Sequence, residues 1–97
     1  MTENGSEILL EAHRLINGDR QQAYDHPAYD YAVVCDIFYG LTGVRLSVDQ
    51  ALRFMVAVKM ARIRTNLEKG RWHTDSAVDA AGYLGCLAMV MKVMSEK

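Results

Sequence analysis

Apolar residues recur every three or four positions along most of the chain, which is the spacing that gathers them on one face of a helix. The first such run covers residues 6–17, begins at Ser6 as a favourable N-cap and is followed by an Asn-Gly stop signal. Its apolar positions are Ile8, Leu9, Ala12, Leu15 and Ile16. Glu7 and Glu11 lie four residues apart and share a face beside this stripe. The pattern predicts a short amphipathic helix.

A second helical run starts at Pro27, which suits a first helical turn because its missing N–H would have no partner there anyway. Its apolar positions are again at helical spacing: Tyr31, Val34, Cys35, Phe38 and Tyr39. We expect this helix to run to about Leu41, with Gly40 and Gly43 ending it.

A third and longer helix is predicted over residues 48–68. Ser47 is its N-cap, Asp49 lies in the first turn where the helix dipole favours negative charge, and Gly70 stops it. Leu52, Met55, Val56, Met60 and Ile63 form its apolar stripe.

A fourth helix, capped by Thr74 or Asp75, runs to about Ser95 and is apolar nearly all round. Short apolar stretches do not alternate as a strand would, so no strand is predicted. The chain is therefore expected to be all-α, a compact four-helix bundle forming a single helical domain over residues 1–97.

Composition narrows the class of protein. Apolar residues make up 51% of the chain and charged residues 24%, as in a soluble globular domain. A net charge of −1 argues against generic DNA binding. The polar, acidic start is unlike a signal or transit peptide, and the nearly uncharged run of residues 80–91 is too short to span a membrane. We therefore expect a cytoplasmic protein.

The segment of residues 18–27, GDRQQAYDHP, differs from the rest of the chain. It has no apolar period and concentrates polar, hydrogen-bonding side chains in one loop. Candidate ligand-binding residues here are Asp19, Arg20, Tyr24 and His26. His26 is suited to act as an acid, a base or a ligand, or equally to make a structural hydrogen bond.

Lys59 falls in the middle of the apolar stripe of the third helix, with Arg62 at its edge one turn on. A lysine in such a place must extend to solvent or meet a negative partner. Two interpretations follow: a cationic site for a phosphate or carboxylate group, or a structural ion pair. The basic surroundings, a local charge of +5 over residues 53–71, favour neither one.

Asp75, Asp79 and Tyr83 line one face of the fourth helix at intervals of four residues. Two carboxylates on one face can bind a divalent cation if further oxygen ligands are near, and Glu11 or Asp30 is the candidate third ligand. The same aspartates are equally suited to neutralise Lys59 or Arg62 within the fold.

Aromatic residues offer a surface on which a nucleotide base could stack. The candidates are Trp72, in the loop before the fourth helix, Tyr83 and Tyr24, although the Trp72 ring is equally suited to cover the core. Cys35 and Cys86 lie on apolar faces, have no metal-type spacing and are interpreted as packing residues.

Three segments in the same order carry a resemblance: GDRQQAYDHP at 18–27, KMAR at 59–62 and DSAVDAAGY at 75–83. Together they resemble a small family of unknown function that is common in bacteriophage genomes. The helical layout is also similar to the all-α nucleoside triphosphate pyrophosphatases, the MazG-like and dimeric dUTPase-like enzymes. Those enzymes hold Mg²⁺ with acidic pairs three residues apart, whereas the pairs Glu7/Glu11 and Asp75/Asp79 are four apart.

The resemblance implies a nucleotide or phosphorylated ligand, with Mg²⁺ as cofactor if the protein is a metal-dependent pyrophosphohydrolase. Asp75 and Asp79 would then be catalytic metal ligands, and Lys59 and Arg62 would hold phosphate oxygens. The alternative is a non-catalytic module that sequesters a nucleotide signal or docks on a host protein. A homo-oligomer is also expected, through the fourth helix with or without the second, because so small a bundle leaves apolar faces uncovered.

Overall fold

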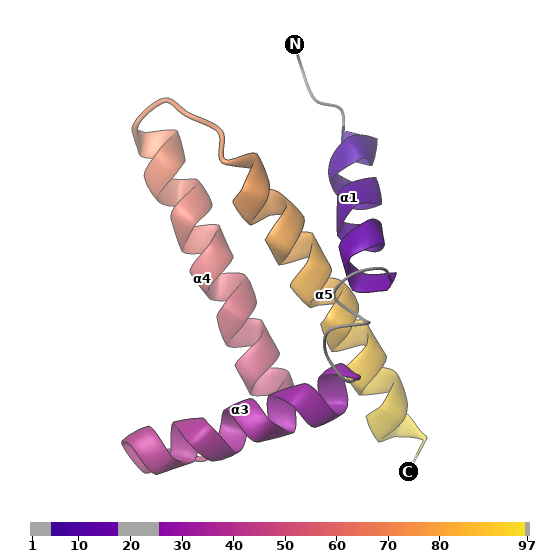
Figure 1. Cartoon of the computed structure of the whole chain (residues 1–97). Coiled ribbons are helices and arrows are strands. Elements are labelled where there is room, and N and C mark those ends of the chain that lie inside the picture. Colours follow the sequence, from indigo (N-terminus) through magenta and orange to yellow (C-terminus); the bar gives the residue numbers. More distant parts are fainter. Residues whose placement is uncertain (1–4, 18–25, 97) are drawn as a thin grey trace.

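Four α-helices make up nearly all of the computed structural model, which describes residues 5–17 and 26–96 (Figure 1). They are α1 (Gly5–Asn17), α3 (Pro27–Thr42), α4 (Val48–Glu68) and α5 (Thr74–Ser95). No strand occurs in these two stretches. The predicted all-α fold with four helices is confirmed, and the predicted bounds of the helices agree with the observed ones to within about a residue.

α5 is the helix on which the other three assemble. α4 runs antiparallel beside it, α1 packs along its other side, and α3 lies across the end of the α4–α5 pair (Figure 1). Among the described helices, the backbone of α1 comes close to α5 alone. Two helices pack tightly at Gly85, where an ideal Cβ would lie only 2.7 Å from Cδ1 of Ile16.

The core is small and lies where α3, α4 and α5 meet. Its buried members are Leu52 from α4 and Tyr83, Cys86 and Val90 from α5. Leu52 and Val90 are fully buried. Partly buried apolar residues from all four helices pack around them: Ile16, Ala28, Tyr31, Val48, Met55, Val56 and Leu87. The core thus ties α5 to every other helix.

Local capping explains where α4 begins and α3 ends. The Ser47 hydroxyl accepts a hydrogen bond from the Gln50 N–H, and the Gln50 side chain accepts one from the Ser47 N–H, which completes a capping box. Gly43 ends α3 in the left-handed conformation, with φ 75°, and donates its N–H to the Tyr39 carbonyl. Both caps were predicted from the sequence.

Three details of capping were predicted wrongly. Ser6 lies inside α1, which already begins at Gly5, and Gly40 lies inside α3. The N-cap of α5 is His73, not Thr74 or Asp75. The His73 ring lies with its Nδ1 2.6 Å from the Ser76 hydroxyl, so this side chain bonds forward into the first turn of the helix instead.

Both thiols are buried, as predicted for packing residues. Cys35 faces inward from α3 and Cys86 belongs to the core. Burial raises the pKa of the Cys35 thiol, because a thiolate is poorly solvated there. Cys35 is therefore poorly suited to act as a nucleophile.

α5 is long and apolar enough to cross a membrane by length and composition alone, although its longest uncharged run is short. The central helix of a bundle meets the same test, and α5 lies between α1 and α4 with seven buried residues along it (Figure 1). Its place in the fold accounts for part of this composition, because 28% of the apolar window is buried.

Leu52→Ala is expected to lower the free energy of unfolding by about 2–5 kcal/mol, because Leu52 is fully buried at the junction of α4 and α5. Urea unfolding followed by circular dichroism measures this change. Leu67→Ala, at a position on the same helix that is 56% exposed, is the control and should cost much less. Equal losses for the two variants would contradict the core described above.

Candidate functional site

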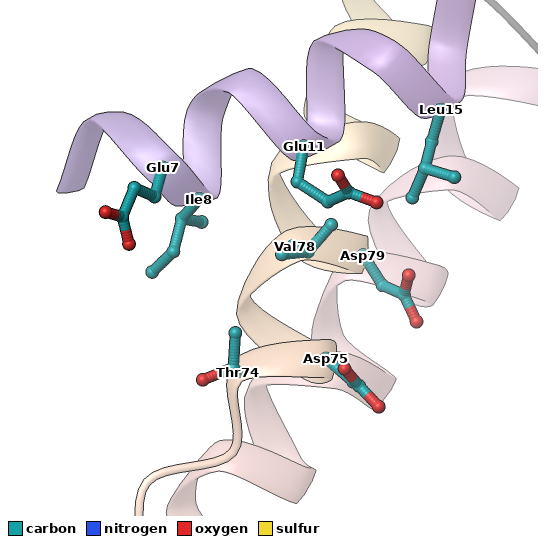
Figure 2. A pocket seen from close by; sticks show the side chains of 8 residues that line it. All are labelled: Glu7, Ile8, Glu11, Leu15, Thr74, Asp75, Val78 and Asp79. Atoms are coloured by element: carbon teal, nitrogen blue, oxygen red, sulfur yellow. The ribbon is translucent and has the colours of Figure 1, made fainter. Parts of the chain in front are cut away.

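The groove between α1 and α5 is lined by four acidic side chains. It has a volume of about 480 Å³ and is lined by Glu7, Ile8, Glu11, Leu15, Thr74, Asp75, Val78 and Asp79. Figure 2 shows that the carboxylates come from two walls, Glu7 and Glu11 from α1 and Asp75 and Asp79 from α5. We refer to it as the acidic groove.

Helical spacing explains why these carboxylates share one groove. Glu7 and Glu11 lie one turn apart on α1, and Asp75 and Asp79 lie one turn apart on α5. Buried Ala12 and Val78 pack where the two helices meet, so the acidic residues are left beside the contact at its edge. Figure 2 shows the side chains of Asp75 and Asp79 pointing to the same side of α5.

On the α1 wall, Glu11 is held by Arg14. Two nitrogen atoms of the Arg14 guanidinium donate to the Glu11 carboxylate, at 2.6 and 3.2 Å. These hydrogen bonds lower the pKa of Glu11, so this carboxylate stays ionised at neutral pH. The pair is exposed, and its effect on stability is therefore small.

On the α5 wall, Asp79 is paired with Lys59 of α4. The Lys59 ammonium lies 2.9 Å from Oδ2 of Asp79, and the Lys59 side chain is only 14% exposed. The sequence placed Lys59 in an apolar stripe and required either exposure or a negative partner. The structure shows the partner and leaves the Asp79 carboxylate between Lys59 on one side and the acidic groove on the other.

Metal binding was predicted at Asp75, Asp79 and Glu11, and all three line the acidic groove. Within residues 5–17 and 26–96, however, no three His, Cys, Asp or Glu side chains lie close enough to hold a metal ion by themselves. A magnesium ion commonly uses only one or two carboxylates, with water or substrate phosphates completing its shell. Asp75 and Asp79, one turn apart, fit that smaller requirement.

Other predicted site residues are not brought to the acidic groove. Arg62 is exposed on α4 and lines a separate shallow hollow of about 430 Å³ with His73. Tyr83 is 8% exposed and belongs to the core. Trp72 is 52% exposed in the turn that leads into α5. These two aromatic residues, which were proposed to stack a base, thus lie outside the lining of the groove.

His26 has a structural role in the described conformation. It is the N-cap of α3, and its Nδ1 accepts a hydrogen bond from the Ala28 N–H at 3.0 Å. Its ring also makes an edge contact with Tyr29. The candidates Asp19, Arg20 and Tyr24 lie outside the described residues.

Two residues that line the acidic groove were not predicted as site residues. Glu7 was recognised as sharing a face with Glu11 but was not assigned to the site, and Thr74 was considered only as a cap. The spacing of the two glutamates was the available signal. This spacing identifies a site only if α1 is known to pack against α5, and helical periodicity does not reveal that contact.

Comparison with known proteins identifies the family. Residues 7–91 match the family described as a domain of unknown function (DUF6378). The chain belongs to this family. The match spans all four helices, including both walls of the acidic groove.

Curated relatives come from bacteriophages, as the resemblance implied. The Gene 55 protein of Mycobacterium phage D29 is 34% identical over 83 residues, and that of Mycobacterium phage L5 is 32% identical over 81 residues. These alignments cover 86% and 82% of this chain but 52% and 49% of the relatives, so the chain spans about half their length. No solved structure matches the chain.

The ion pair between Lys59 and Asp79 is expected to contribute to stability because the lysine is largely buried. Lys59→Met and Asp79→Leu should each lower the free energy of unfolding, by about 1–3 kcal/mol, and Asp79→Leu should cost more, because it leaves the largely buried Lys59 ammonium unpaired, whereas the Asp79 side chain is 33% exposed. The double variant should lose less than the sum of the two. Urea unfolding of all four proteins measures the coupling, and strictly additive losses would contradict it.

Proposed function

We propose that the acidic groove binds a nucleotide or another phosphorylated small molecule together with a divalent cation. The observation that carries the proposal is the lining, in which four acidic residues from two helices border one groove of about 480 Å³. Small-molecule sites commonly have volumes of roughly 300–1,000 Å³. The groove is therefore of a suitable size for a ligand of this class.

The negative charge of the groove lining supports a divalent cation as part of the bound ligand. The lining contains four acidic residues and no lysine or arginine, and the Arg14 hydrogen bonds lower the pKa of Glu11. A phosphate group alone would be repelled by these carboxylates. A phosphate that shares a divalent cation with them would be attracted, because the cation offsets charge on both sides.

Each residue then has a distinct part. Asp75 and Asp79 would hold the cation from α5, and Glu11 would face it from α1, directly or through water. Lys59 already contacts Asp79 at 2.9 Å and would exchange that carboxylate for a phosphate oxygen of the ligand. The buried stem of Lys59 limits the positions that its ammonium can reach, which orients the phosphate.

If the site is catalytic, the cation would supply an activated water and offset the charge that develops on the phosphates. The protein would then be a metal-dependent nucleotide pyrophosphohydrolase of the MazG-like kind. The second candidate is a module that sequesters a nucleotide signal or docks on a host protein without chemistry. This candidate is favoured by one observation, that no three potential metal ligands cluster among the described residues.

Incubation of a mixed ribo- and deoxyribonucleotide pool with excess protein, Mg²⁺ and Mn²⁺ separates these candidates. Catalysis predicts that one triphosphate disappears while its monophosphate forms, as followed by ion-exchange chromatography. Chelation of the cations by EDTA should abolish that conversion. Sequestration predicts an unchanged pool but a nucleotide retained on the protein after gel filtration.

Matched variants connect the outcome to the groove. Glu11→Gln and Asp75→Asn are expected to reduce binding or turnover at least tenfold, because each removes a carboxylate from the lining. Glu68→Gln is the control, since Glu68 is likewise exposed and bonded to a neighbouring arginine, Arg64, but lies outside the groove. Full activity in Asp75→Asn, or equal losses in the control, would contradict the proposed site.

A further inference from the structure

The outer face of α3 exposes a continuous apolar stripe. Its members are spaced four residues apart along the whole helix, and their exposed fractions are 72% for Tyr29, 56% for Val33, 59% for Ile37 and 79% for Leu41. The opposite face of α3, with Cys35, packs against α4 and α5. A helix that is apolar on both faces is expected to be covered on both. We propose that a second copy of this chain covers the stripe, so that the protein is a homodimer through α3.

The radius of gyration and the accessible surface of the protomer both exceed those of a typical compact monomer, as expected if a partner covers part of the surface. A compact domain of 97 residues should have a radius of gyration of about 12.5 Å, whereas this chain has 14.8 Å. Its accessible surface is 6782 Å², about 1,200 Å² more than the roughly 5,600 Å² typical of a monomer of this mass. A standard protein interface removes about 800 Å² from each partner. The excess is therefore large enough for one such interface.

The stripe also suits an identical partner. In a two-fold dimer the same patch meets itself, so any charge on it would face its own copy. The four positions of the stripe carry no charge, and two carboxylates flank it, Asp30 in the first turn of α3 and Asp36, which is paired with Arg45 at 2.9 Å. Two copies of α3 can thus meet through the uncharged positions, with Asp30 and Asp36 at the edge of the contact.

Gly40 is a further indication of close approach. It lies inside α3 among the exposed positions, where glycine costs about 1 kcal/mol of helix stability relative to alanine. An added Cβ would meet nothing within 4 Å in the protomer, so packing within one chain does not require glycine here. Close contact with the backbone of a second helix would favour glycine here.

Light scattering coupled to gel filtration of the full chain tests the dimer. At micromolar concentrations we expect about twice the protomer mass of 10.9 kDa. A monomeric mass for the wild-type chain would overturn the proposal and would indicate that a different protein covers the stripe. This outcome is independent of nucleotide binding, because the acidic groove lies between α1 and α5 and not on α3.

Charge variants locate the interface. Ile37→Glu should raise the dimer dissociation constant at least a hundredfold, because two carboxylates would be buried in contact. Leu67→Glu, at a position of similar exposure on α4, is the control and should stay dimeric. Circular dichroism should show that both variants remain helical. Mixing Ile37→Glu with Ile37→Lys should restore dimers through opposite charges, whereas a dimeric Ile37→Glu protein would place the interface elsewhere and overturn the proposal.

Discussion

The packing of α5 against the other three helices is the contact on which the rest of the structure depends. Leu52 of α4 and Val90 of α5 are fully buried there, and α1 and α3 add partly buried residues around them. With so few fully buried side chains, each contributes a large share of the few kcal/mol by which a domain of this size is stable. The position of the residues that line the acidic groove follows from how α1 meets α5.

This arrangement also explains why charge collects in one place. α1 and α5 meet through small apolar residues such as Ala12 and Val78, so the acidic residues next to them border the contact and form the groove. On the two walls, Glu11 is bonded to Arg14 and Asp79 to Lys59. The pair with Lys59 matters more, because it links α4 to the wall of the groove and is partly shielded from water.

The helices were predictable because their signals are local. Ser47 with Gln50 and Gly43 with its left-handed backbone define helix ends within a few residues of sequence. The start of α5 was less predictable, because histidine is not among the preferred N-cap residues. The ring of His73 instead contacts the Ser76 hydroxyl inside the first turn of the helix. The crossing of α3 over the end of the α4–α5 pair depends on contacts between distant parts of the chain, which no local signal encodes (Figure 1).

The candidate site was predictable in part for the same reason. Periodicity showed that Lys59 needed a partner and that Asp75 and Asp79 share a face, but the choice of Asp79 over other acids is set by packing. Tyr83 follows the aspartates at helical spacing, yet it is buried because α3 and α4 close over that end of α5. The second wall, with Glu7 and Glu11, appears only once α1 is placed on α5.

The central claim is that the acidic groove receives a divalent cation, and paramagnetic Mn²⁺ added to the isotope-labelled chain tests it most directly by NMR. Mn²⁺ broadens the signals of nearby nuclei, so the amides of Asp75, Asp79 and Glu11 should broaden first. Those of Asp36 and Asp49, whose carboxylates lie outside the groove, should persist at the same Mn²⁺ concentration. Equal broadening at Asp36 and Asp49, or no selective broadening along α1 and α5, would contradict the claim.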